Sequence, residues 1–253
     1  MRRVRTIATL AAATVLSACG ATQGPTPAPS ATPTTAEVEA RYQPPSNPCD
    51  AVSAATRRKY RLTQPQDKVF PYTGAETASG DMVMADTIQC TWAVKNPAKG
   101  QNGRSNRFTL TLDFQVPTAE DGDLVGTVAR AASKHDVTPV HAAQALLDSA
   151  QADLEGETAG VTTTLERSEP VNDLGDRAYS AVLTQKNDFG TSTMVVVAFQ
   201  AANAHVKVSH SGADLKIDPT LPEGLQLVTT PVPPRRLKPA AQAVARDALE
   251  ALG

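Results

Sequence analysis

The sequence contains few aromatic residues, few cysteines and only a short apolar run at its start. Phe, Trp and Tyr make up 4% of the 253 residues, and tryptophan occurs once. Much of the 41% hydrophobic share is alanine, so a core must be built from small and β-branched side chains. The run from Ile7 to Leu16 has ten residues, whereas a helix that spans a bilayer needs about 20. This run therefore cannot cross a membrane.

The chain also lacks the short motifs that mark the common enzyme classes. It contains no Gly-x-Ser-x-Gly, Ser-x-x-Lys, Lys-Thr-Gly or His-Glu-x-x-His sequence, no phosphate loop and no dinucleotide fingerprint. A helix break separates His135 from His141. His205 and His210 would lie on opposite faces of one strand, and the scattered Asp and Glu offer no distinct pair for acid–base catalysis. The sequence thus predicts no catalytic residue, no metal site and no cofactor.

The charges show no large excess of either sign. Lys and Arg number 24, Asp and Glu number 26, and the formal net charge is −2. Loss of Arg2, Arg3 and Arg5 with a cleaved leader would bring the net charge to −5. A mildly acidic exported protein is a poor partner for nucleic acid, so no nucleic-acid binding is expected.

Residues 1–18 have the layout of a secretory signal peptide. A basic start is followed by the apolar run and by the sequence Leu16-Ser17-Ala18-Cys19. This ending resembles that of a bacterial lipoprotein leader, in which the cysteine is diacylated before the peptide is cut. We therefore expect a lipid anchor on Cys19, at the extracytoplasmic face of the cell membrane, because two acyl chains anchor a protein stably. The alternative is an ordinary secreted precursor with a chance cysteine.

Residues 19–46 are expected to form a disordered tether and residues 47–253 a single folded domain. Seven prolines lie among Thr, Ala and Ser between positions 20 and 48, a composition typical of disordered linkers. This tether would reach about 30 Å as a flexible coil and about 90 Å if stretched as polyproline. It would lift the domain off the lipid headgroups.

Two of the three cysteines remain free to pair if Cys19 is acylated. Cys49 and Cys90 would then meet in an oxidising compartment, where a disulfide is expected. Closing a loop of roughly 40 residues stabilises a fold by about 4 kcal/mol in the chain-entropy model. The alternative is two reduced, buried thiols.

The hydrophobic pattern after the tether predicts an α+β domain with a single antiparallel sheet of five or six strands and helices packed on it. The clearest strand runs from Arg107 to Val116, where every second residue is apolar. Other strands are expected at 87–94, which brings Cys90 and Trp92 to one face, and at about 160–168, 176–186, 191–200 and 204–210. Residues 62–86 predict mostly loop with a short strand at 82–84, and residues 219–234 predict a proline-rich surface connection.

Four helices are expected beside the sheet. Ser53 can cap a short helix through Tyr60, and Thr138-Pro139 starts a helix with a cap and a proline in its first position. Glu120, Asp121 and Asp123 lack the spacing of a calcium-binding loop. They are instead expected to lie in the first turn of another helix. The last helix starts at Pro239.

Two of these helices have narrow stripes of small residues, at 143–150 and 241–248, and most of the stripe residues are alanine. Small side chains let a helix approach a sheet closely. The sequence therefore predicts a filled helix–sheet interface, without a pocket of the roughly 300 to 1,000 Å³ that small-molecule sites occupy.

Two groups of polar residues are candidates for surface binding: Arg57, Arg58 and Lys59 on the first helix, and His205 and Lys207 on the strand at 204–210. Three cations suit the C-terminus of a helix, but they could also bind an anionic wall polymer. The strand residues share a polar face with Ser209. That face is either solvated or a binding site.

Four short motifs follow the leader: Asn47-Pro48-Cys49, Cys90-Thr91-Trp92, Leu174-Gly175-Asp176-Arg177-Ala178-Tyr179, and Gln200-Ala201-Ala202-Asn203. Together they resemble a family of uncharacterised actinobacterial lipoproteins. Members open with Asn-Pro-Cys and a short helix, pair that cysteine with one in a Cys-x-Trp-like strand, and close with an antiparallel sheet and a helix. This chain departs from them by the paired helices between Asp121 and Leu154. The resemblance implies a fold and a location, and no activity.

These observations together favour a non-catalytic binding or accessory module at the cell envelope. Its expected partners are the membrane, through the lipid anchor, and an envelope protein or polymer. A carrier or sensor for an apolar small molecule is the alternative, and an enzyme with an unfamiliar site comes third. A carrier needs a lumen and an enzyme needs a polar cleft, whereas a protein-binding module can be solid.

Overall fold

The computed structural model describes residues 42–76, 82–94, 107–117, 139–158, 160–188, 190–217, 219–220 and 227–253. All of them belong to one compact unit, Val38–Gly253. Its elements are η1 (Pro48–Ala51), α1 (Ala54–Tyr60), β1 (Leu62–Glu76), β2 (Met82–Val94), β3 (Arg107–Gln115), α3 (Pro139–Ala152), β4 (Gly156–Thr158), β5 (Val161–Pro170), β6 (Arg177–Asn187), β7 (Gly190–Ala201), β8 (Ala204–Ile217), β9 (Leu227–Pro231), η2 (Pro234–Arg236) and α4 (Lys238–Leu252). The expected leader, most of the tether and the helix expected after residue 120 lie outside the described residues.

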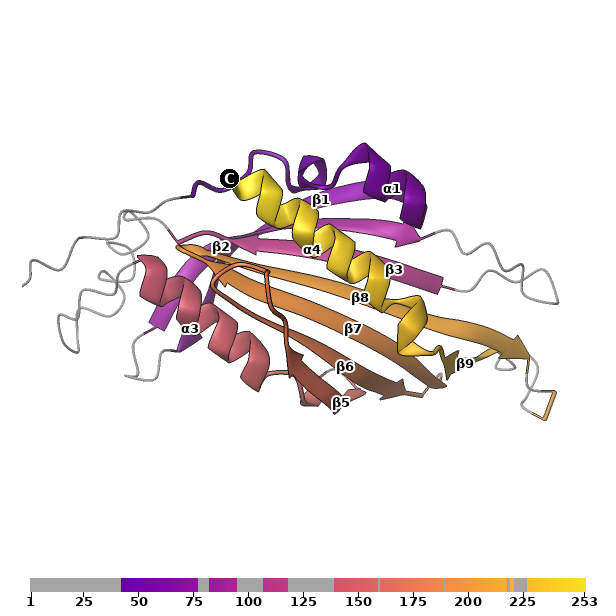
Figure 1. Ribbon diagram of the computed structural model, residues 1–253. Coiled ribbons are helices and arrows are strands. Elements are labelled where there is room, and N and C mark those ends of the chain that lie inside the picture. Colours follow the sequence, from indigo (N-terminus) through magenta and orange to yellow (C-terminus); the bar gives the residue numbers. More distant parts are fainter. Residues whose placement is uncertain are drawn as a thin grey trace, which may run out of the picture. The chain divides into compact units, whose positions relative to one another are not determined.

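The strands form one sheet in the order β1-β2-β3-β8-β9-β7-β6-β5-β4, and β8 also pairs with β7 (Figure 1). The pairs are antiparallel, except for a parallel bridge between Gly190 of β7 and Thr229 of β9. The strands β1 to β3 and the strands β4 to β8 meet where β3 pairs with β8. There Gln115 lies opposite His205 and Asp113 opposite Lys207.

The α+β class agrees with the sequence pattern, but the predicted five or six strands are wrong, because the sheet has nine. The additional strands are β1, β4 and β9. Residues 62–76, expected as loop, form the long edge strand β1, and β9 lies within the expected surface connection.

Proline placement explains why β1 was not expected. Proline cannot donate a ladder hydrogen bond, so it is tolerated at sheet edges and at bulges. Pro65 lies in the register shift between Thr63 and Gln66, and Pro71 lies in the shift between Phe70 and Thr73. Both prolines therefore fall where pairing with β2 is already interrupted.

One face of the sheet carries the main core under α4. The helix crosses β8 and β7 (Figure 1), and its buried residues are Ala240, Ala241, Val244, Ala245 and Ala248. They pack in one cluster with alternate residues of the strands, including Val195, Val197, Val206 and Val208. The alanine stripe of α4 therefore packs on the sheet, as its pattern predicts.

The other face of the sheet carries α3. Val196 and Ala198 of β7 join Leu147 and Leu154 in a second cluster, whereas their neighbours Val195 and Val197 belong to the α4 cluster. Successive residues of a strand point to opposite faces. The two helices therefore cover opposite faces of the central strands.

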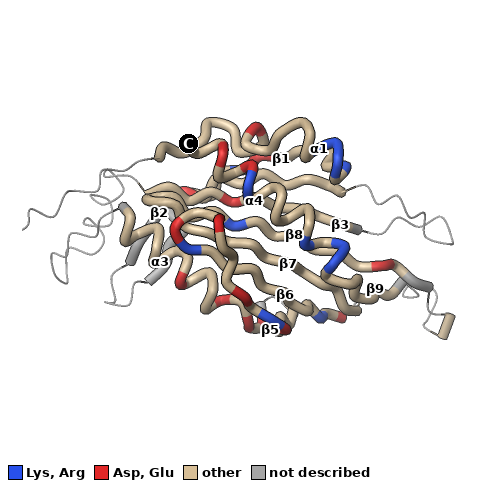
Figure 2. The backbone as a smooth tube through the Cα atoms, viewed as in Figure 1, with Lys and Arg blue, Asp and Glu red and all other residues tan. Residues whose placement is uncertain are grey.

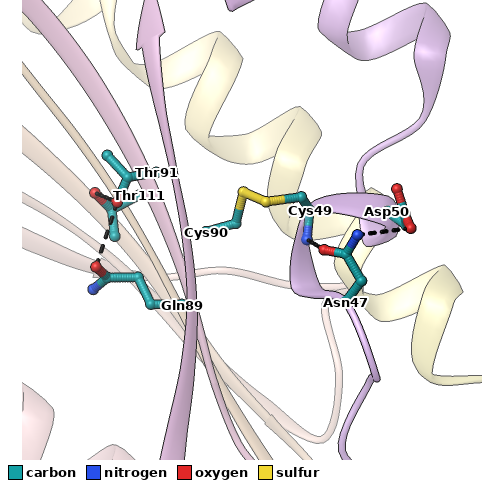
Figure 3. The surroundings of a disulfide bond; sticks show 7 residues. All are labelled: Asn47, Cys49, Asp50, Gln89, Cys90, Thr91 and Thr111. Atoms are coloured by element: carbon teal, nitrogen blue, oxygen red, sulfur yellow. Dashed lines mark hydrogen bonds between the residues drawn. A yellow bond between two sulfur atoms is a disulfide. The ribbon is translucent and has the colours of Figure 1, made fainter. Parts of the chain in front are cut away.

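A disulfide ties the first helices to the sheet. Cys49 of η1 is bonded to Cys90 of β2 with a Cα–Cα distance of 5.2 Å, as the sequence predicted. Figure 3 shows Cys90 pointing toward η1, while Gln89 and Thr91 point to the other side of β2. Asn47 caps η1 by accepting a hydrogen bond from the Cys49 N–H at 3.0 Å, and Ser53 caps α1 through the Thr56 N–H.

Asn203, at the tip of the β7–β8 hairpin, holds two distant parts of the chain. Its Oδ1 accepts from the Tyr42 N–H at 2.9 Å, and its Nδ2 donates to the carbonyls of Tyr42 and Pro117, both at 3.0 Å. The side chain is fully buried. The end of the tether region and the end of β3 are therefore fixed at the same hairpin.

Candidate functional site

A groove of about 530 Å³ lies between α3 and the sheet. Seven of its lining residues are aliphatic or Met, and eight are polar or charged. The lining consists of Leu146, Ser149, Ala150, Asp153 and Leu154 from the α3 region, with Gln115, Val161, Thr163, Leu183, Gln185, Met194, Val196, His205, Lys207 and Ser209 from the sheet.

This groove contradicts the expectation of a filled interface under α3. The apolar residues of the helix contact the sheet in two places. Near its start, Ala142, Ala145 and Leu146 cluster with Ala85 of β2, and toward its end Leu147 contributes to the cluster on β6 and β7. Between these strands lie β3 and β8, and their residues in the groove, Gln115, His205, Lys207 and Ser209, are polar.

His205 lies on this polar floor and is 3% exposed, so the expectation of a solvated strand face is wrong for it. Its Nδ1 lies 2.8 Å from Gln115 Oε1. A carbonyl oxygen can only accept, so Nδ1 carries the proton and Nε2 presents a lone pair. That Nε2 is buried without a hydrogen-bond partner among the described residues.

Burial keeps His205 uncharged. Burial, together with a smaller effect of the nearby Lys207 cation, lowers the pKa of the imidazole to about 3. His205 is therefore a neutral hydrogen-bond acceptor at any pH near neutrality.

The charged residues of the floor balance one another. Lys207 Nζ lies 3.7 Å from Asp113 Oδ2, and Gln89 Nε2 donates to Asp113 Oδ1 at 2.8 Å. Just past the end of α3, Asp153 accepts from Ser149 Oγ at 3.3 Å and makes no ion pair with the described residues. The two charged lining residues, Lys207 and Asp153, are opposite in sign.

Tyr179 adds a second polar atom on the α3 face. Its hydroxyl is buried without a partner among the residues described, and it belongs to the cluster that includes Leu147. Burial raises its pKa strongly, and the Asp153 carboxylate adds to this. The phenol therefore stays protonated.

The two predicted groups of surface residues do not come together. Arg57, Arg58 and Lys59 lie on the last turn of α1, which contacts α4 and β1, on the other side of the sheet from the groove. The basic cluster is visible at the end of α1 in Figure 2. The Lys59 ammonium lies 5.3 Å from the centre of the Tyr60 ring. These cations make no ion pair with the part of the chain that the structure describes.

The described ranges contain no group of three His, Cys, Asp or Glu residues close enough to hold a metal ion. None of their helices is both long and apolar enough to cross a membrane. Cys19 lies outside these ranges.

The motifs behind the family resemblance include a structural turn. Gly175 has φ +67°, and a Cβ there would lie 2.4 Å from the Gln200 carbonyl oxygen. The Asp176 N–H donates to that oxygen at 2.8 Å, and its carboxylate accepts from the Ala202 N–H at 2.7 Å. The motif holds the β6 start against the end of β7.

Comparison with protein-family models, with curated proteins and with solved structures finds no match to this chain. The resemblance to actinobacterial lipoproteins therefore stays a prediction.

Proposed function

We propose that the protein is a membrane-anchored, extracytoplasmic binding module without catalytic activity, and that the groove under α3 is its ligand site. The groove carries this proposal, because its volume falls within the range of about 300 to 1,000 Å³ that is typical of small-molecule sites. A buried acceptor without a partner in its floor is a second reason, since such a group costs free energy until a donor reaches it.

The lining favours a binding module over a carrier for a purely apolar molecule. Eight of the fifteen lining residues are polar or charged. An apolar ligand would strip water from these groups without replacing their hydrogen bonds, which costs roughly 1–3 kcal/mol for each group left unpaired. A ligand with both polar and apolar parts avoids this penalty.

A ligand-capture experiment tests the proposal. The chain from residue 20 onward contains the whole compact unit Val38–Gly253, which has its own core and can be exported so that Cys49 and Cys90 pair. We expect native mass spectrometry to detect a bound small molecule after incubation with an extract of cell envelopes. Ala150→Trp should abolish this adduct, because Ala150 lines the groove.

Ala152→Trp is the matched control. Ala152 is an exposed residue on the same helix and does not line the groove, so its variant should keep the adduct. An adduct that persists in Ala150→Trp, or a wild-type chain that captures nothing, would contradict the proposal. Capture of hydrocarbons alone would favour the apolar carrier.

A further inference from the structure

The lining of the groove limits the chemistry of its ligand in three ways. Its walls are aliphatic, with Leu146 and Leu154 facing Leu183, Met194 and Val196. No Phe, Tyr or Trp side chain is present among the described residues that line it, and the small imidazole of His205 is the aromatic ring among them. The groove therefore offers little stacking surface for a nucleobase or a sugar ring and suits an aliphatic chain.

The second limit is charge. Lys207 and Asp153 are the charged lining residues, and each has a neighbour: Asp113 for the ammonium and the Ser149 hydroxyl for the carboxylate. An anionic ligand would have to displace Asp113 from Lys207 and would meet the Asp153 carboxylate, whereas a cationic ligand would be attracted by Asp153 but repelled by Lys207. A neutral ligand is repelled by neither charge.

The third limit is hydrogen bonding. Gln115 fixes the His205 ring through Nδ1. The other ring nitrogen, Nε2, keeps a lone pair that has no hydrogen-bond donor among the described residues. Only a donor can satisfy a lone pair. Because Nε2 is closed to solvent in the structure, a ligand with an O–H or N–H group reaches it when a neighbouring lining side chain moves aside.

We infer that the groove binds a neutral amphiphile, which lays an aliphatic chain against Leu146, Leu183 and Val196 and donates a hydrogen bond to Nε2 of His205. This inference rests on the proposed function and names the class of its ligand. A hydroxylated lipid or a fatty amide has this chemistry. A hydrocarbon, a fatty acid anion and an alkylammonium ion do not.

Paired probes separate the donor from the chain. 1-Decanol and 1-methoxydecane share the same aliphatic chain, but only the alcohol donates a hydrogen bond. We expect the alcohol to bind the chain from residue 20 about ten times more tightly, because the ether leaves the buried Nε2 unpaired. Binding is followed by the ¹³C-methyl NMR signal of Met194, which lines the groove and is assigned with Met194→Leu.

His205→Leu should remove the preference by lowering the affinity for the alcohol to that for the ether. His210→Leu is the matched control, because His210 is also buried, with Nδ1 bonded to the Leu237 carbonyl and Nε2 unpartnered among the described residues. It lies on the α4 face, away from the groove, and its variant should keep the tenfold preference. His205→Gln, which retains an acceptor, serves if His205→Leu does not fold, and should keep part of the preference.

The outcomes distinguish this inference from the proposed function. Equal binding of the alcohol and the ether by the wild type would overturn the neutral-donor ligand and leave the groove as a binding site. If decanoate or decyltrimethylammonium bound more tightly than 1-decanol, the inference that the ligand is neutral would be overturned. A Met194 signal that responds to none of the four probes overturns the amphiphile, and together with an empty capture experiment it overturns the groove as the site.

Discussion

His205 and His210 lie five positions apart on β8 and are buried on opposite faces of the sheet, each under a different helix. In both, one ring nitrogen has a partner and the other has none among the described residues. Burial lowers the pKa of both imidazoles, and for His210 the Leu237 carbonyl partly offsets this effect. The folded protein thus holds two neutral histidines that the unfolded chain would protonate in mild acid.

This arrangement predicts how stability depends on pH. The unfolded His205 takes up a proton near pH 6.5, whereas the folded residue does so only near pH 3. Between these values the unfolded state binds more protons, so the free energy of unfolding falls as the pH falls, by up to about 1.4 kcal/mol per pH unit for each such histidine. Urea unfolding between pH 7 and pH 4 should show this decline.

His205→Gln should flatten that decline by about 1 kcal/mol per pH unit, because glutamine does not titrate and His210 contributes the remainder. An unchanged slope would mean that the folded protein protonates His205 freely. The groove floor would then be more accessible to water than the buried position of His205 indicates.

At the scale of elements, η1 and α1 depend on the disulfide for their place beside the sheet. Thr56 is the buried residue of α1, so the helix contributes little apolar contact. A double substitution, Cys49→Ala with Cys90→Ala, is expected to lower the free energy of unfolding by about 4 kcal/mol, because the bond closes a loop of 41 residues. Urea unfolding measures the loss, and mass mapping without reduction tests the bridge itself. Two alkylated thiols in the native protein would contradict it.

Local patterns predicted the elements that need no information about distant neighbours. The alternation of side chains along a strand predicted that Cys90 and Trp92 share one face, which is buried. Capping residues in the sequence predicted the observed starts of α1 and α3. The edge strand β1 was missed because Pro65 and Pro71 normally exclude a strand. Only its pairing with β2 shows that both prolines fall at register shifts.

The groove was missed for a related reason. The polar residues of β3 and β8 alternate like those of a solvated face, and the alternation is the same whether water or a helix covers it. Gln115 and His205 lie 90 positions apart, and no local pattern shows that they become neighbours beneath α3. The sequence did contain one signal of the groove, which was the presence of two strands with polar faces together with a helix of small residues.

At the scale of the whole molecule, the proposed membrane location rests on Cys19. We expect Cys19→Ala to abolish acylation and to leave the leader uncut, because the lipoprotein peptidase acts after diacylation of that cysteine. Metabolic labelling with a palmitate analogue checks this. The Cys49→Ala, Cys90→Ala variant is the control and should keep its label. Label on the Cys19→Ala chain would contradict the lipoprotein prediction.

The two hydrogen bonds between Tyr42 and Asn203 predict how the protein responds to mechanical force. A pull transmitted through Tyr42 loads its two hydrogen bonds with Asn203 together with its buried side chain. If they part, peeling stops at Cys49, whose covalent bond passes the load to β2. If the chain is anchored through Cys19, as proposed, tension would thus open a short stretch of chain, while β3 and β8, the floor of the groove, keep their register.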